Sequence, residues 1–78
     1  MLSREEITKI VSIFLNGGFD EESGKDYSDE ELDQLAEYFG KNIPNSHGIA
    51  LIFFPDRCGF DTDEPTIEEI VDKAMQEE

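Results

Sequence analysis

Three times along this chain of 78 residues, the pattern [ST]-x-x-E stands directly before a run of spaced apolar residues. The three copies begin at Ser3, Ser28 and Thr66. In such a capping box the hydroxyl accepts a hydrogen bond from a free N–H of the first helical turn, and the Glu carboxylate accepts one from the cap residue's own N–H. Further acidic residues in each first turn complement the helix dipole. Three helix starts in so short a chain predict a helical fold.

The apolar residues after each box recur at i, i+3, i+4 and i+7, so each set occupies one face of a helix. We expect these faces to form the core: Ile7, Ile10, Val11 and Phe14; Leu32, Leu35, Ala36 and Phe39; Ile67, Ile70, Val71 and Ala74, with Met75 beside them. Gly17 and Gly18 are predicted to end the first helix. Gly40 stands where a C-terminal cap is expected for the second.

The run 49–54, between Gly48 and Pro55, is apolar throughout. Periodicity does not decide between a buried strand and a short helix for six residues. No other segment has a strand pattern, so we predict a short third helix that ends at Pro55, because a residue before proline avoids the helical conformation. The connections 20–27, 42–48 and 56–65 are predicted to be irregular. The expected fold is a single all-α domain, residues 1–78, with four helices.

Charge is the most unusual feature of the composition. Six Lys and Arg face twenty Asp and Glu, which gives a net charge of -14. Nucleic acids and anionic membranes need cationic contacts, so neither is an expected partner. A cationic protein would be attracted, and its association accelerated. The alternative is that the charge serves solubility alone.

Cys58 is the single cysteine, so no internal disulfide can form, as is usual for cytosolic proteins. The N-terminal residues contain an early acidic pair and no long apolar run, which is typical of neither a signal peptide nor a membrane span. We therefore expect a cytoplasmic protein.

Residues that could carry catalysis or bind a metal are sparse. His47 and Cys58 follow no spacing rule for a nucleophile pair, and four zinc ligands are lacking. An EF-hand loop aligned on Gly24 or Gly59 would put a Phe at its first, acidic position. There is no phosphate-binding glycine loop, and the Asp-Ser-Leu element of acyl carrier proteins is absent. We expect no catalytic residue, no metal and no cofactor.

The run 49–54 is also the candidate binding surface. A helix this short cannot turn every side chain inward, so we expect Leu51 and one Phe to face the core. Some of the others should reach the surface: Ile49, Ile52, Phe53 and Phe54. An exposed aromatic cluster surrounded by acidic residues has the anatomy of a protein-binding hot spot. The alternative is that neighbouring helices cover the whole run.

The segment 31–55, Glu-Leu-Asp-Gln-Leu-Ala-Glu-Tyr-Phe through Gly-Ile-Ala-Leu-Ile-Phe-Phe-Pro, resembles the immunity proteins of nuclease colicins and pyocins. An acidic turn and the segment 65–71 look like the start of their last helix, and the first helix fits in position and pattern. The resemblance implies a distorted antiparallel four-helix bundle with a short third helix. It also implies an inhibitor, and no enzyme, that binds the nuclease domain of a cognate bacteriocin beside its active site and blocks substrate access.

In that family the third helix supplies an Asp and two Tyr as anchors, and the second helix supplies variable residues that select the partner. The matching anchor positions are Ala50, Phe53 and Phe54, with Ile49 adjoining them. The matching selecting positions are Asp29, Leu32, Asp33, Ala36 and Gly40. This chain therefore lacks the anchor carboxylate and both phenol hydroxyls. A hydrogen bond to a charged group is worth roughly 1.5–3 kcal/mol, so its anchor differs from that of the family.

We therefore expect a bacteriocin immunity protein whose partner is a basic nuclease domain. The alternative is an acidic helical adaptor or regulator without a toxin partner, and a toxin gene beside this one would favour the first. We expect a monomer, or a weak homodimer formed through the Phe pair.

Overall fold

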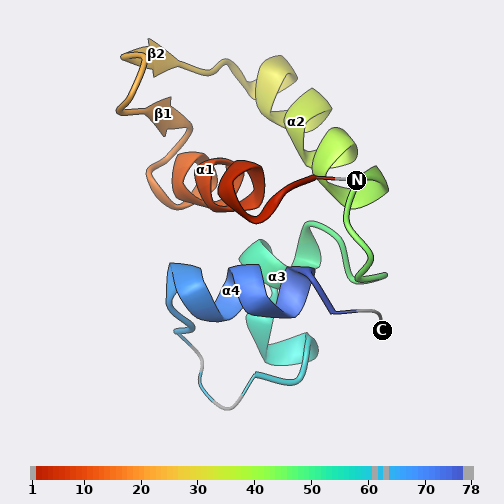
Figure 1. Ribbon diagram of the computed structural model, residues 1–78. Helices are drawn as coiled ribbons and strands as arrows, with labels where there is room; N and C mark the ends of the chain where they lie inside the picture. The colour runs from red at the N-terminus through yellow and green to blue at the C-terminus, as the bar shows by residue number, and fades with distance from the viewer. Residues whose placement is uncertain (1, 61, 63, 77–78) are drawn as a thin grey trace.

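The computed structural model describes residues 2–60, 62 and 64–76. This part of the chain is mostly helical, with four α-helices, a 3-10 turn and a small two-stranded sheet (Figure 1). In chain order the elements are α1 (Arg4–Leu15), β1 (Phe19–Asp20), β2 (Lys25–Asp26), α2 (Asp29–Lys41), α3 (Ala50–Phe53), η1 (Pro55–Arg57) and α4 (Ile67–Ala74).

All three predicted capping boxes are present. In each box the cap hydroxyl accepts a hydrogen bond of 3.2 Å from the backbone N–H three residues on, and that residue's carboxylate accepts from the cap N–H. The pairs are Ser3 with Glu6, Ser28 with Glu31 and Thr66 with Glu69. A cap of this kind stabilises a helix by about 1 kcal/mol, so the boxes fix where the three longer helices begin.

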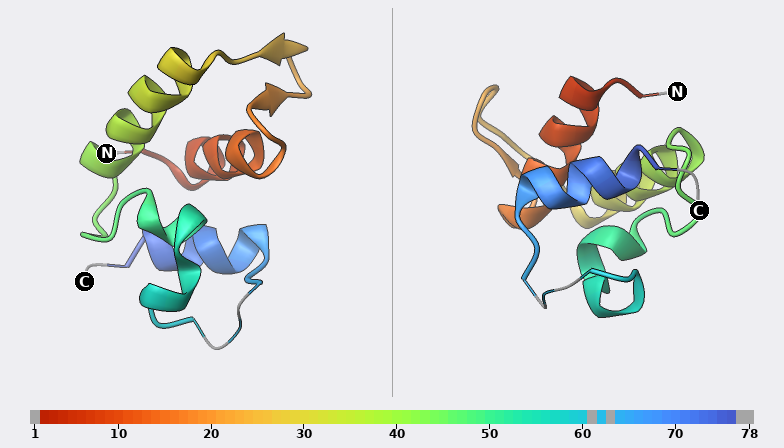
Figure 2. Two further views of the ribbon diagram at one scale, coloured as in Figure 1. Left: turned by 180° about the vertical axis from the view of Figure 1, so that it is seen from behind. Right: turned by 60° about the horizontal axis from the view of Figure 1, so that its bottom comes forward.

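Helix α1 lies at the centre of the arrangement. It packs most extensively against α4 and also contacts α2, α3 and β1. In Figure 1 the hairpin and α2 lie on one side of α1, and α3 and α4 lie on the other; the left view of Figure 2 agrees. Within the described ranges, α2 has no close backbone contact with α3 or α4. The hairpin and α2 therefore form one part of the fold, and α3 and α4 form the other. The two parts are joined through α1 and a shared core.

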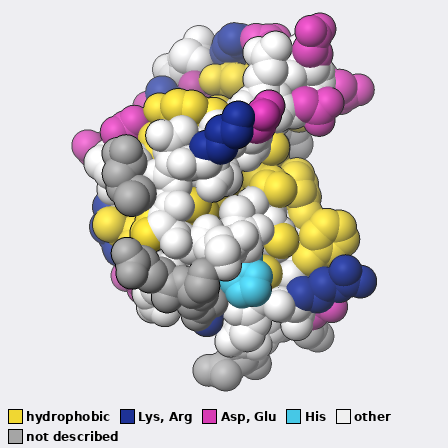
Figure 3. Space-filling model, turned by 90° about the vertical axis from the view of Figure 1, so that its right-hand side faces the viewer, with side chains coloured by type: hydrophobic (Ala, Val, Ile, Leu, Met, Phe, Trp, Pro, Cys, Tyr) yellow, Lys and Arg dark blue, Asp and Glu magenta, His cyan; other side chains and the backbone are white. Residues whose placement is uncertain are grey.

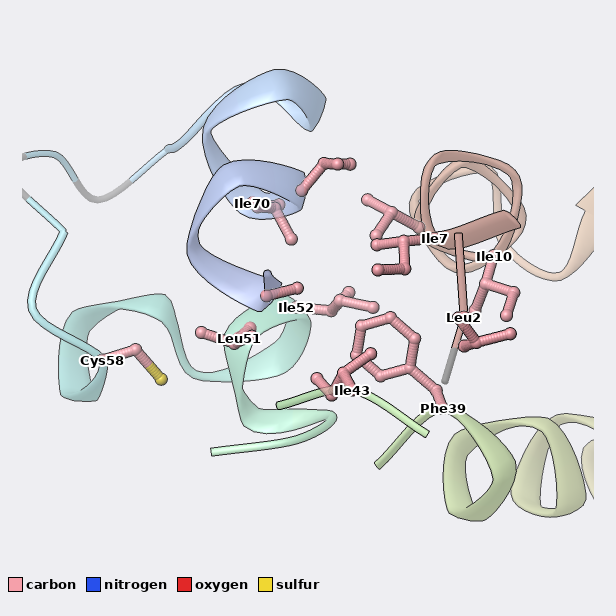
Figure 4. Close-up of a cluster of buried hydrophobic side chains, with 12 residues drawn as sticks. Leu2, Ile7, Ile10, Phe39, Ile43, Leu51, Ile52, Cys58 and Ile70 are labelled. Carbon is pink, nitrogen blue, oxygen red and sulfur yellow. The ribbon is translucent and has the colours of Figure 1, made fainter. Parts of the chain in front are cut away.

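The core joins residues of all four helices. Phe39 extends from α2 toward Ile7 of α1, while Leu51 and Ile70 approach from α3 and α4 (Figure 4). Complete burial of such a side chain contributes roughly 1.5–3 kcal/mol. The buried cluster consists of Leu2, Ile7, Ile10, Val11, Phe39, Ile43, Leu51, Ile52, Cys58, Ile70, Val71 and Ala74.

The three predicted apolar faces are therefore buried to different extents. Phe14, Leu32, Leu35 and Ala36 are only half-buried. The predictions that Ile67 and Met75 belong to the core are wrong. Ile67 is the first residue of α4 and Met75 is its C-terminal cap, and both lie at the molecular surface. The first turn of α4 thus extends beyond the shared core.

Residues 20–27 were predicted to be irregular, but part of this segment forms a β-hairpin. β1 and β2 pair antiparallel, with Phe19 opposite Asp26 and Asp20 opposite Lys25. Strands of two residues are too short to show the alternating pattern that identifies a strand. The turn between them is held by the buried carboxylate of Asp20, which accepts hydrogen bonds from the Glu22 N–H at 3.1 Å and the Ser23 hydroxyl at 2.9 Å. The fold is therefore mostly helical but not purely so.

Gly40 is not the C-terminal cap of the second helix, so that prediction is wrong. α2 continues through Gly40 to Lys41, and Asn42 is the cap residue. Gly40 instead lies against Gly48, where a Cβ would come within 3.4 Å of the Gly40 Cα. Gly48 has a φ of 57°, a conformation that favours glycine. The two glycines let the turn before α3 approach α2 closely.

The turn before α3 is also tied to α4. Asn45 is almost completely buried, and its side-chain amide donates a hydrogen bond of 2.9 Å to the backbone carbonyl of Lys73. Its side-chain oxygen accepts one of 2.8 Å from the backbone N–H of His47. Buried polar groups left without a partner are costly, so these bonds fix the start of α3.

Candidate protein-binding surface

The short helix α3 turns its middle residues toward the core, and two phenylalanines at its end lie at the surface. Leu51 and Ile52 are buried, whereas 54% of Phe53 and 51% of Phe54 is exposed. The helix is a single turn, and Phe54 leaves it with a non-helical φ of -133° directly before Pro55. We expected one of the two rings to face the core; instead both lie at the surface, and Ile52 is buried in their place.

Phe53 is partly held by α1. Its ring packs edge-on against the ring of Phe14, with 5.5 Å between the ring centroids and an angle of 85° between the planes. Aromatic pairs in this geometry contribute about 0.5–1.5 kcal/mol beyond the burial of their area. Phe53 therefore presents an exposed ring whose orientation is already restricted.

A shallow hollow of about 360 Å³ lies beside Phe53, where the end of α1 meets the start of α2. Its walls come from three helices and the glycine turn after α1: Phe14, Gly17, Gly18, Asp29, Leu32, Asp33 and Phe53. Four of the nine predicted site residues thus share one surface. Figure 3 shows a band of hydrophobic side chains at one edge of the molecule, with acidic side chains above it and a basic one below it.

The other five predicted residues do not line this hollow. Ile49 and Ala50 are half-buried and pack against the core cluster, and Ala36 is also half-buried. Gly40 is half-buried against Gly48. These four have less surface to offer a partner than the predicted roles imply. Phe54 is exposed, with the Arg57 guanidinium carbon 5.4 Å from its ring centroid.

The acidic part of the surface is the first turn of α2. Asp29 and Asp33 are exposed at the hollow, whereas the carboxylate of Glu31 is bonded at 2.6 Å to the ammonium of Lys25 on the hairpin. That hydrogen bond, together with those from Ser28, lowers the pKa of Glu31, and it raises the pKa of Lys25. The carboxylates of Asp29 and Asp33 are therefore available to a partner at the hollow, whereas the carboxylate of Glu31 is paired within the fold.

Four residues of this surface were not predicted from the sequence: Phe14, Gly17, Gly18 and Arg57. Phe14 was assigned to the core because it lies on the apolar face of α1, and the two glycines were assigned only to the end of that helix. A Cβ on Gly18 would come within 3.0 Å of Leu32, so the glycine turn approaches α2 closely. Nothing in the local sequence signals this approach.

A larger hollow of about 800 Å³ lies on the opposite, polar face of α1, between β1 and the first turn of α4. Exposed apolar side chains border it, namely Leu15, Phe19 and Ile67, and Lys9 and Glu22 lie at its rim. It contains none of the predicted site residues.

The two residues considered for catalysis lie in different environments. Cys58 is buried, and its thiol lies 3.5 Å from the carbonyl oxygen of Phe54. His47 is exposed. Within residues 2–60, 62 and 64–76, no three His, Cys, Asp or Glu side chains are grouped so that they could hold a metal ion. No helix in the same ranges has the length and apolar character needed to cross a membrane.

Comparisons of the chain with protein-family models, with curated proteins and with solved structures found no match.

Proposed function

We propose that this chain is a cytoplasmic bacteriocin immunity protein, which binds the basic nuclease domain of a cognate colicin- or pyocin-like toxin and inhibits it. The proposal includes the finer description of the fold, in which the four helices correspond to the distorted antiparallel bundle of that family. It rests on the sequence resemblance, on the acidic charge and on the surface formed by α3 and the start of α2.

The observation that carries the proposal is the exposure of two adjacent phenylalanines on a single-turn helix. Half of each ring is open to solvent, and large aromatic residues dominate the binding energy of protein interfaces. Phe53 shares the hollow with two exposed carboxylates of α2, those of Asp29 and Asp33. An apolar anchor with an acidic neighbour suits a partner that has an apolar socket in a basic surface.

Inhibition follows from competition for the same positive surface. A nuclease needs cationic groups to hold the phosphates of its substrate. A protein of charge -14 that docks beside those groups repels a nucleic acid as well as obstructing it. The charge also accelerates association with the toxin, so inhibition would be established soon after synthesis.

The chain departs from the family at its anchor. Ala50 stands where the family has an Asp, and it packs against the core. The two rings carry no hydroxyl. The proposed socket on the toxin is therefore more apolar than the sockets of toxins that meet an Asp and two Tyr.

The test is a binding assay of the purified chain against a panel of nuclease domains from colicin- and pyocin-type bacteriocins, at low and high salt. Binding that weakens with salt and abolishes nuclease activity supports the proposal. A variant that carries both Phe53→Ala and Phe54→Ala is the control and should neither bind nor inhibit. Absence of binding across the panel at both salt concentrations would remove the immunity function.

A second candidate is an acidic helical adaptor without a toxin partner. The hollow on the polar face of α1 favours it, because Leu15, Phe19 and Ile67 are exposed there. A partner that requires Leu15 and Phe19 but tolerates Phe53→Ala would identify the adaptor.

A further inference from the structure

Most of the few cations of this chain are paired with carboxylates within the fold. Four of the six Lys and Arg residues form such ion pairs with carboxylates of the residues that the structure describes. The pairs are Arg4 with Asp72, Lys9 with Asp20 and Glu22, Lys25 with Glu31, and Lys41 with Glu37. In an acidic protein this is the expected result, because a carboxylate is near almost every position.

Arg57 is different. It is exposed at the end of η1 and forms no ion pair with a carboxylate of the described residues, although Asp56 precedes it. Its guanidinium carbon lies 5.4 Å from the centroid of the Phe54 ring. A guanidinium stacks favourably on an aromatic face. The cation thus stands next to one of the two proposed anchors.

We propose that Arg57 is a recognition residue that binds a carboxylate of the partner protein beside the socket for Phe53 and Phe54. A guanidinium offers paired N–H donors in the geometry that a carboxylate accepts. Contact with the Phe54 ring restricts the Arg57 side chain before binding, which reduces the entropy lost on association. That the partner is a toxin rests on the proposed function. That Arg57 binds a carboxylate of the partner is argued from the exposed cation and its contact with Phe54 alone.

The partner is therefore defined more narrowly than by charge alone. Its surface is basic overall, to match the carboxylates of α2, and it carries an Asp or Glu beside an apolar socket. A nucleic acid phosphate also fits a guanidinium, but Asp29 and Asp33 lie on the same side as Phe53 and would repel the neighbouring phosphates. A protein carboxylate is the better match.

Replacement of Arg57 distinguishes a specific contact from general charge attraction, because the two predict opposite changes in affinity. Replacing Arg57 with Gln makes the chain more negative, so attraction to a basic partner should strengthen. If Arg57 binds a partner carboxylate, the same change should weaken binding despite the added attraction. Since a hydrogen bond to a charged group is worth roughly 1.5–3 kcal/mol, the loss should be roughly 10- to 100-fold in affinity.

The experiment is a selection of displayed random peptides on the full chain and on its Arg57→Gln variant, followed by affinity measurements on the selected peptides. Peptides selected on the unaltered chain should combine apolar and cationic residues with an Asp or Glu. That acidic residue should be rare in the peptides selected on Arg57→Gln. Phe54→Ala should abolish their binding, and Arg57→Lys should bind with intermediate affinity because it keeps the charge and loses the planar fork. Circular dichroism of each variant checks that it is folded.

Equal frequencies of Asp and Glu in the two pools, or tighter binding by Arg57→Gln, would overturn the proposal, as would the absence of any selected binder. Arg57-dependent binding of a single-stranded oligonucleotide would also overturn it, in favour of a nucleic acid ligand. The nuclease panel is a separate measurement. A chain that binds no nuclease domain but selects acidic peptides through Arg57 would lose the immunity function and keep this contact.

Discussion

The ring of Phe53 stands edge-on to the ring of Phe14 at a centroid distance of 5.5 Å, while about half of Phe53 remains exposed. Phe14 lies on the apolar face of α1, 39 residues earlier in the chain. The contact couples the candidate surface to the central helix. Phe54, its neighbour, instead lies against Arg57. Removal of either ring should therefore affect folding and binding in different proportions.

If Phe53 and Phe54 are the anchors proposed above, replacing either with Ala should weaken binding of the partner by at least about 30-fold, because a few residues at the centre of an interface carry most of the binding energy. Phe53→Ala should also lower the free energy of unfolding by about 1 kcal/mol through loss of the ring contact, and Phe54→Ala by less. Urea unfolding and calorimetric titration with a nuclease domain measure the two effects.

Tyr38→Ala is the matched control, because Tyr38 is similarly exposed, at 49%, and does not line the hollow. It should bind as the unaltered chain does. If both Phe variants also bind unchanged, the anchor assignment is wrong.

Combining Asp29→Asn with Asp33→Asn should slow association with a basic partner by roughly threefold at low salt and much less at high salt, since steering is screened by ions. Glu64→Gln with Glu68→Gln makes the same change in net charge away from the hollow. Stopped-flow association rates compare the two pairs. Equal slowing by both would assign steering to the total charge and remove the selecting role of Asp29 and Asp33.

Gly48→Ala and Gly24→Ala should destabilise the fold by similar amounts. Both glycines have positive φ, 57° and 71°, and a left-handed conformation costs an alanine about 1–2 kcal/mol. A Cβ on Gly48 would lie 3.4 Å from the Gly40 Cα, an ordinary van der Waals distance, and at Gly24 nothing lies within 4 Å. Urea unfolding of the two variants measures the losses. A clearly larger loss for Gly48→Ala would mean that the turn before α3 has no room for a methyl group beside Gly40.

The hairpin turn should be sensitive to acid. The Ser23 hydroxyl lowers the pKa of the Asp20 carboxyl most, and the Glu22 N–H and the Lys9 ammonium act in the same direction, against the effect of burial. A carboxyl whose pKa is lowered on folding stabilises the fold at pH values above its pKa in the unfolded chain, which is about 4. This stability is lost as the pH falls through the lowered pKa of the folded protein. Asp20→Asn should therefore be less stable than the unaltered chain at pH 7.

The difference in unfolding free energy between the two proteins should narrow below about pH 4. Asp26→Asn is the control, because Asp26 is exposed on β2. A difference for Asp20→Asn that stays constant from pH 7 to pH 3 would show that the charge of Asp20 does not stabilise the turn.

Local signals account for the parts of the fold that could be predicted. The caps at Ser3, Ser28 and Thr66 depend on hydrogen bonds within four residues, so the sequence identifies them directly. Which side of α3 meets the core depends instead on residues far along the chain, and we placed one Phe inward where Ile52 is buried. The role of Gly40 could not be predicted for the same reason, since its neighbour Gly48 comes from another segment.

The candidate site was predictable to a similar degree. The motif around Pro55 indicates an aromatic surface, but the contacts of Phe53 with Phe14 and of Phe54 with Arg57 are tertiary. Asp29 and Asp33 were matched to partner-selecting positions through the family resemblance, and charged residues are expected at the surface. That they share a hollow with Phe53 follows only from the folded arrangement.

In the described part of the chain, α2 and α3 face the same hollow without close backbone contact with each other. A substitution at Asp29 or Asp33 can therefore change the charge of the hollow without altering a backbone contact of α3. This separation has an evolutionary consequence. If the surface binds a partner as proposed, a lineage could exchange the charges of α2 to suit a new partner while α3 keeps its exposed phenylalanine.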